Sequence, residues 1–298
     1  MTKVLANYDE AALDAEYNNS EKVPDAADKL QKYADMSAEL RSQLAGRLGV
    51  AFGPDHEEVL DIFPALEAAK GPASPAPIQV FIHGGYWMKM TKDDFSYVAR
   101  AFVPKGCAAV VINYALIPAV GMDELVRQCR AALAWTHRNA ASIGGDPDRI
   151  FISGHSAGGH LVAMMMATDW PEFDDLSPTL PRDLIKGGCG ISGLYDLEPI
   201  RLCYLNEVLK LTGIEAARNN PVQMKPGGSG KLLLTVGGEE GPEYRRQSED
   251  LAAAWRGHGV DVEVAVLEKQ NHFTIVEQLS DPDAELSRLI LQQMGQGD

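Results

Sequence analysis

The fold is decided by residues 149–159, whose sequence is RIFISGHSAGG. Residues 149–153 form a short, almost continuous apolar run, which is typical of a strand covered on both faces. Two glycines then flank Ser156 in the pattern G-x-S-x-G, and helical spacing begins at Ala157. A strand, a sharp turn and a helix in this order predict that the Ser156 hydroxyl projects from the carboxyl edge of a sheet. The Ala157 amide would then point to the space in front of the serine.

Similar apolar runs recur along the chain and alternate with segments of helical spacing. The runs cover residues 78–82, 108–112, 231–236 and 260–266, and the helical segments cover residues 123–139, 157–168 and 244–258. Strands that alternate with helices pair in parallel through right-handed crossovers. The sequence therefore predicts an α/β fold with a mostly parallel central sheet and helices on both faces.

The remaining segments are predicted to surround this sheet within a single domain that spans residues 1–298. Residues 1–43 are expected to form an N-terminal helical arm, because Ala and Leu recur there at helical spacing. Residues 57–64 predict one more strand, which ends at a proline. Between about residues 171 and 230 the alternation gives way to prolines, glycines and short helical pieces. We expect that stretch to be a lid-like insertion over the active site.

A glycine pair follows the apolar run at 78–82, in the sequence His83-Gly84-Gly85-Tyr86-Trp87. Glycines directly after a strand let the backbone turn its N–H groups inward without obstruction by a Cβ atom. We therefore predict that Gly84 and Gly85, together with Ala157, donate hydrogen bonds to a carbonyl oxygen that becomes negatively charged. His83 is expected to hold this loop. Tyr86 and Trp87 are predicted to form an aromatic wall that binds the substrate.

A serine nucleophile also needs a general base and an acid, which follow it along the chain in the order acid and then histidine. His272 lies just beyond the run at 260–266 and is the one histidine that follows a late strand. The acid is expected after the run at 231–236, where glutamates stand in place of an aspartate. A glutamate can orient the imidazole and stabilise the imidazolium equally well. Glu240 is the preferred acid, Glu239 is the alternative, and Glu243 or another carboxylate is left as a third possibility.

The composition excludes several classes of function. The chain has 27 Lys and Arg against 42 Asp and Glu, and this net charge of −15 argues against binding to nucleic acid. There is no apolar run of about 18 residues, so we expect no membrane span. The first residues lack the apolar segment of a secretory signal, and the four cysteines form no C-x-x-C pair, so we expect a cytoplasmic protein. No metal motif occurs, and neither metal nor cofactor is expected. The oligomeric state is left open, and a homodimer is compatible with the sequence.

Three segments together resemble the arylformamidases, also called kynurenine formamidases: residues 83–87, 154–161 and 191–200. That group consists of α/β-hydrolases allied to the hormone-sensitive-lipase-like esterases, and the resemblance covers most of the chain from about residue 20. It implies that Ser156 is the nucleophile and His272 the base. The family's aspartate falls on or next to Glu240, where this chain departs from the pattern. The resemblance also implies that the substrate is a small molecule, N-formyl-L-kynurenine, which is hydrolysed to kynurenine and formate.

A second class of enzyme shares all of these residues. A carboxylesterase acting on short-chain acyl esters, or a hydrolase of another small N-acyl amide, would differ only in its acyl and leaving-group pockets. The sequence leaves these alternatives open.

Overall fold

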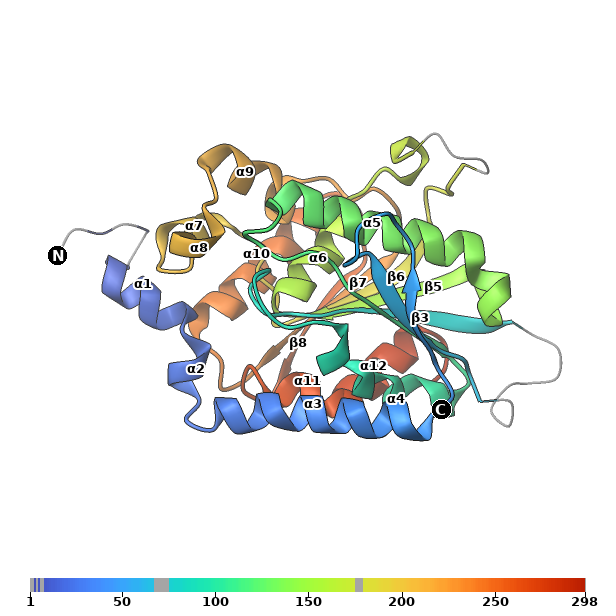
Figure 1. Ribbon diagram of the computed structural model, residues 1–298. Helices are drawn as coiled ribbons and strands as arrows, with labels where there is room; N and C mark the ends of the chain where they lie inside the picture. Colours follow the sequence, from blue (N-terminus) through green and yellow to red (C-terminus); the bar gives the residue numbers. More distant parts are fainter. Residues whose placement is uncertain (1–2, 4, 6–7, 67–74, 175–178, 298) are drawn as a thin grey trace.

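A computed structural model of the protein describes residues 3, 5, 8–66, 75–174 and 179–297. At its centre lies an eight-stranded sheet with the strand order β1-β2-β4-β3-β5-β6-β7-β8 (Figure 1). β1 pairs antiparallel with β2, and β2 with β4, whereas all the following pairs are parallel. The strands are β1 (Arg47–Ala51), β2 (Val59–Phe63), β3 (Ala76–Ile82), β4 (Ala108–Ile112), β5 (Gly145–His155), β6 (Ile185–Ile191), β7 (Lys231–Gly237) and β8 (Val262–Leu267). The predicted α/β architecture is confirmed.

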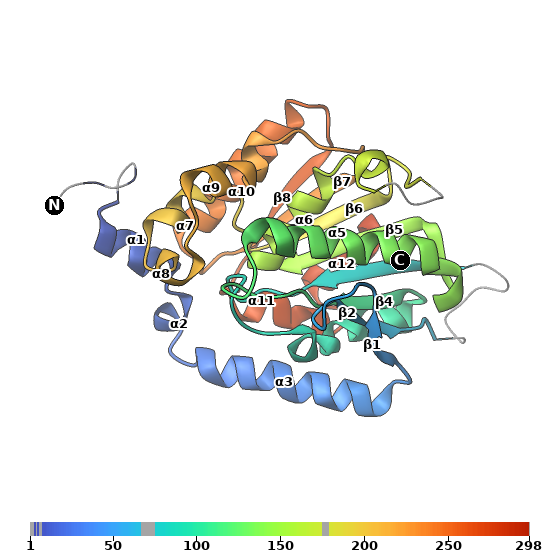
Figure 2. The ribbon, with the colours of Figure 1, turned by 45° about the horizontal axis from the view of Figure 1, so that its top comes forward.

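Helices cover both faces of the sheet and divide the core into two layers (Figures 1 and 2). One layer holds α5 (Met122–Asn139), α6 (Ala157–Met166) and α10 (Pro242–Arg256), and the other holds α3 (Ala26–Gln43), α4 (Ala99–Phe102), α11 (Thr274–Glu277) and α12 (Glu285–Gln293). Successive strand residues point to opposite faces, so Val80 packs in the first layer and Phe81 in the second. Because helices bury both faces of the sheet, the central strands are apolar on both faces.

The expected insertion at residues 171–230 needs a correction, because its middle part is the central strand β6. β6 lies between β5 and β7 and pairs in parallel with both. Three of its seven residues are glycines, which have low β-propensity and hide the strand from pattern analysis. The glycines are needed for packing: a Cβ atom at Gly188 would overlap the sulfur of Met166 on α6. The inserted helices come only after β6, as α7 (Glu198–Leu202), α8 (Asn206–Leu209) and α9 (Gly213–Arg218).

The N-terminal arm contains two short helices, α1 (Glu10–Tyr17) and α2 (Asn19–Lys22), in addition to the long α3. α1 lies against α7, and α3 runs along the outside of the sheet's second helical layer (Figures 1 and 2). The arm is anchored by buried aromatic residues, since Tyr17 and Tyr33 are almost fully inaccessible to solvent. It therefore brings residues from the start of the chain to the carboxyl edge of the sheet. None of the helices in the described ranges combines the length and the apolar character of a membrane span.

Candidate active site

Ser156 lies at the sharp turn between β5 and α6, as the G-x-S-x-G pattern predicts. Its φ of 57° and ψ of −116° place it in a conformation that non-glycine residues rarely adopt. The surrounding structure holds this strained turn, because the Ser156 amide donates a 2.8 Å hydrogen bond to the carbonyl of Ile191 at the end of β6. The missed strand β6 thus supports the serine directly.

His272 and Glu240 form a close pair beside the serine. His272 Nδ1 and Glu240 Oε1 are 2.6 Å apart, and the two side chains are only 7% and 1% exposed. The other carboxylate oxygen, Oε2, accepts hydrogen bonds from the Gly237 amide at 2.6 Å and from the Ser192 hydroxyl at 2.5 Å. These hydrogen bonds fix the orientation of the Glu240 carboxylate. Its partner imidazole is therefore held in the tautomer with Nδ1–H toward Glu240 and Nε2 free to act as a base.

The structure also separates the three candidate acids. Glu239 is exposed, and Glu243 is buried but binds Tyr17 and Arg246. Glu240 is the one of the three that contacts His272. The geometry therefore favours the preferred candidate.

His155 supports His272 from the backbone side, which sequence analysis did not anticipate. Its Nε2 lies 2.8 Å from the His272 carbonyl oxygen, and the centroids of the two rings are 4.7 Å apart. Burial holds the pKa of His155 well below its ordinary value, so the ring is neutral and its Nε2–H donates to that carbonyl. His155 occupies the variable position of the G-x-S-x-G pattern, and nothing local in the sequence signals this role.

Gly84, the first residue of the glycine pair, lies against the serine. A Cβ atom at Gly84 would be 3.2 Å from the Cβ of Ser156 and 2.7 Å from the His155 carbonyl oxygen. His83 Nδ1 holds the loop through the Gly84 carbonyl at 2.8 Å, while its ring stacks on Tyr114 with centroids 4.2 Å apart. Burial lowers the pKa of His83 to about 4, so this contact uses the neutral ring. The Ala157 amide lies in the first turn of α6, where N–H groups have no acceptor within the helix.

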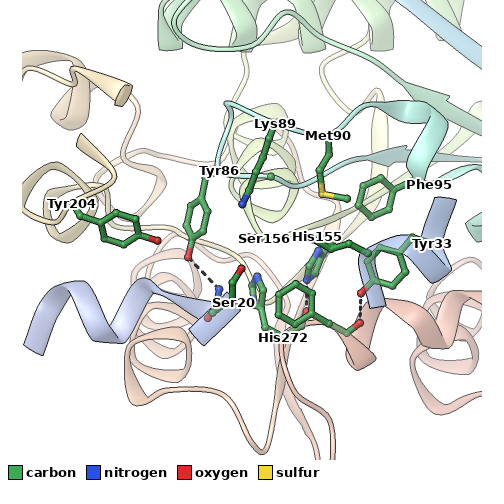
Figure 3. A pocket seen from close by; sticks show the side chains of 14 residues that line it. Ser20, Tyr33, Tyr86, Lys89, Met90, Phe95, His155, Ser156, Tyr204 and His272 are labelled. Carbon is green, nitrogen blue, oxygen red and sulfur yellow. Dashed lines mark hydrogen bonds between the residues drawn. The ribbon is translucent and has the colours of Figure 1, made fainter. Parts of the chain in front are cut away.

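A pocket opens beside Ser156 and His272, and Tyr86 forms part of its wall (Figure 3). The Tyr86 hydroxyl donates to the Tyr17 carbonyl at 2.6 Å and accepts a 3.1 Å hydrogen bond from the Asn19 amide. Asn19 also donates to the Tyr244 hydroxyl at 2.7 Å, and the Tyr244 ring packs on His272 with centroids 4.9 Å apart. The N-terminal arm is therefore connected to the candidate base through Asn19 and Tyr244.

The prediction that Trp87 binds the substrate is corrected by the structure. Trp87 is fully buried and does not line the pocket. Its indole Nε1–H donates to His160 Nδ1 at 3.2 Å, and the two rings meet edge to face. Both Tyr86 and Trp87 have positive φ, so the chain turns sharply directly after the glycine pair. That turn sends Tyr86 to the pocket and Trp87 into the core.

The wall opposite the sheet comes mainly from the N-terminal arm. Four of its residues line the pocket: Asn19, Ser20, Leu30 and Tyr33. Tyr204 is the only residue in the described part of 171–230 that does so. The arm thus takes much of the covering position that the sequence suggested for the later insertion.

Among the described residues, no three His, Cys, Asp or Glu side chains converge as a metal site. The arrangement around Ser156 instead suits nucleophilic chemistry.

Comparisons with known proteins identify the family of the chain. The BD-FAE family model matches residues 60–196. The kynurenine formamidase of Danio rerio is 35% identical over 86% of this chain and 84% of its own length, and that of Salmo salar is 34% identical over 83% and 82%. A crystal structure of a candidate thioesterase from Silicibacter sp. TM1040 superposes with a TM-score of 0.78 and 32% identity, and covers 92% of this chain and 97% of that one. The chain therefore belongs to the kynurenine formamidase family of α/β-hydrolases.

Proposed function

We propose that this hydrolase cleaves an N-formyl arylamide, N-formyl-L-kynurenine, to kynurenine and formate through a formyl-enzyme. The observation that carries the proposal is the 2.6 Å contact between His272 and Glu240 in the pocket that also holds Ser156. Kinship with kynurenine formamidases supports the choice of substrate.

In the first half of the reaction, Ser156 Oγ attacks the formyl carbon while His272 Nε2 accepts the hydroxyl proton. The carbonyl oxygen becomes an oxyanion, and the amides of Gly84, Gly85 and Ala157 are the donors that face it. One donor of this kind stabilises the transition state by about 3 kcal/mol. The C–N bond then breaks, and His272 returns the proton to the departing aryl amine.

In the second half, water replaces the amine. His272 accepts a proton from the water as its oxygen attacks the formyl-enzyme, and then gives the proton to Ser156 Oγ. The C–O bond to the serine breaks, and formic acid leaves and loses its proton to water to become formate. Glu240 stabilises the imidazolium in both halves and does not itself take up a proton.

The walls of the pocket suit a small acyl group and a flat leaving group. Five aromatic side chains line it, namely Tyr33, Tyr86, Phe95, Tyr204 and Phe273. Packing of an aryl amine against such rings adds about 0.5–1.5 kcal/mol beyond the burial of its area. The formyl group is the smallest acyl group and reaches a serine that is only 3% exposed.

The test compares N-formyl-L-kynurenine with acyl esters on the purified protein. We expect kcat/KM to fall from formyl to acetyl to butyryl derivatives of the same aryl amine. Ser156→Ala serves as the control for background hydrolysis. Preferred turnover of butyryl esters with N-formyl-L-kynurenine untouched would replace the formamidase by a short-chain carboxylesterase.

A further inference from the structure

We infer that Lys89 selects substrates whose leaving group carries a carboxylate. The inference rests on the proposed function in one respect, since it takes Ser156 as the reacting centre. It adds one residue to the site formed by Ser156, His272 and Glu240, and it adds a requirement for a negative charge on the substrate.

The first observation is the charge of the pocket. Fourteen of the described residues line it, and Lys89 is the only Lys, Arg, Asp or Glu among these fourteen. The chain as a whole has a net charge of −15, so a pocket whose one fixed charge is positive stands out from its surroundings. A low-polarity cleft with a single cation attracts anionic ligands and disfavours cationic ones.

The second observation is that the Lys89 ammonium has no partner among the described residues. Its Nζ makes no hydrogen bond or ion pair there, whereas Lys92, three residues later, binds Asp61 at 2.9 Å and Asp93 at 2.7 Å. The Lys89 side chain extends into the pocket between Tyr86 and Met90, toward the region of Ser156 (Figure 3). The charge is therefore available to a ligand.

The third observation is that the backbone of Lys89 is held in place. Its amide donates to the Gly85 carbonyl at 3.1 Å, and a Cβ atom at Gly85, whose φ is +108°, would overlap the Lys89 carbonyl. Tyr86, Trp87 and Met90 all have positive φ as well. Residues with strained backbone persist only where the surrounding structure holds them in place, and they are frequent at functional sites. The loop therefore keeps Lys89 at a constant position relative to the predicted oxyanion donors.

These observations identify the ligand group. A formyl group has only hydrogen on its carbonyl carbon, so a charge on the substrate must lie in the leaving group. One ammonium without a second cation matches a single negative charge, which fits a carboxylate better than a phosphate dianion. Because this contact is remote from the breaking bond and equal in ground state and transition state, it lowers KM and leaves kcat nearly constant.

The experiment uses two matched pairs of substrates on the full-length protein. The formamide pair is N-formyl-L-kynurenine and its α-carboxamide, and the ester pair is 4-acetoxybenzoate and 4-acetoxybenzamide. We expect the wild type to prefer the carboxylate member of each pair by about twofold to fivefold in kcat/KM, as for an exposed charge pair. Lys89→Met should abolish the preference through KM, Lys89→Arg should retain most of it, and Lys89→Glu should reverse it.

Two controls separate this electrostatic effect from a structural one. Lys225→Met removes an exposed lysine that does not line the pocket, and it should keep the wild-type preference. Raising NaCl from about 50 mM to about 500 mM should weaken the preference of the wild type and leave Lys89→Met unaffected, because salt screens exposed charges.

The outcomes distinguish this inference from the proposed function. A Lys89→Met variant that loses equal activity on both members of a pair, or a wild type with no preference, overturns the role of Lys89. If N-formyl-L-kynurenine is not cleaved but 4-acetoxybenzoate is preferred in a Lys89-dependent way, the formamidase proposal fails and the carboxylate selection stands. If both formamides are cleaved at equal rates, the formamidase proposal stands and the carboxylate selection by Lys89 fails.

Discussion

Two regions of the molecule meet at the pocket, and they are built in different ways. The carboxyl edge of the sheet supplies Ser156, Glu240 and His272, each in the turn or loop that follows a parallel strand. The N-terminal arm supplies Asn19 and the other residues of the facing wall. In the proposed mechanism the first region performs the chemistry, with groups that any member of the fold can place at this edge. The second region shapes the pocket, so chemistry and pocket shape can vary separately in this architecture.

The largest effect is expected where the sheet edge provides the nucleophile. Ser156→Ala should reduce kcat by about 10⁴-fold to 10⁶-fold, since it removes only the attacking oxygen. Steady-state kinetics on N-formyl-L-kynurenine measures the loss, and an unchanged urea midpoint shows that the fold is intact. Residual activity above about one part in a thousand would contradict the role of Ser156.

A somewhat smaller effect is expected from the acid at the same edge. Glu240→Gln should lower kcat by about 10³-fold to 10⁴-fold, because an amide neither fixes the correct tautomer of His272 nor stabilises its imidazolium. Glu239→Gln is the matched control, and it should stay within about threefold of wild type because Glu239 is exposed. A larger loss in the Glu239 variant would reverse the assignment.

Trp87 tests whether an aromatic residue of the motif acts on the substrate or on the core. Since its ring is fully buried against His160, Trp87→Ala should destabilise the protein by about 3–5 kcal/mol. Urea denaturation measures this loss. Below the unfolding transition, the ratio of kcat/KM for N-formyl-L-kynurenine to that for a small aliphatic formyl ester should stay at its wild-type value. A selective loss on N-formyl-L-kynurenine would return Trp87 to the substrate wall.

The smallest effect is expected in the arm. Asn19→Ala leaves the hydroxyls of Tyr86 and Tyr244 without their amide donor, and this should reduce kcat/KM by about tenfold. Asn18→Ala is the matched control, because the Asn18 side chain makes no capping hydrogen bond. Equal activity of the two variants would show that the arm covers the pocket without positioning Tyr244 and His272.

Residues adjacent in sequence account for the part of the site that was predictable. The strand–serine–helix turn, the glycine pair and the order of acid and histidine depend on local backbone sterics and on parallel strands that end at one edge. Those demands act over a few residues, so they leave a pattern in the chain. The sheet's parallel strands 78–82, 108–112 and 231–236 were predictable for the same reason, since burial on both faces requires apolar runs.

Contacts between residues that are distant in sequence account for the parts of the fold and of the site that could not be predicted. β6 has a glycine-rich sequence, and only its neighbours β5, β7 and α6 make it a strand. Glu240 was one of three candidate glutamates until its contact with His272 was known.

Short-range steric requirements in the sequence established the α/β class and predicted the candidate nucleophile, the candidate base and the glycine pair. The tertiary structure decided which glutamate pairs with His272, that Trp87 is a core residue, and that the arm covers the pocket. Asn19 and Tyr244 are 225 positions apart, yet they share a hydrogen bond. No local pattern encodes such a contact, since it depends on the packing of the whole chain.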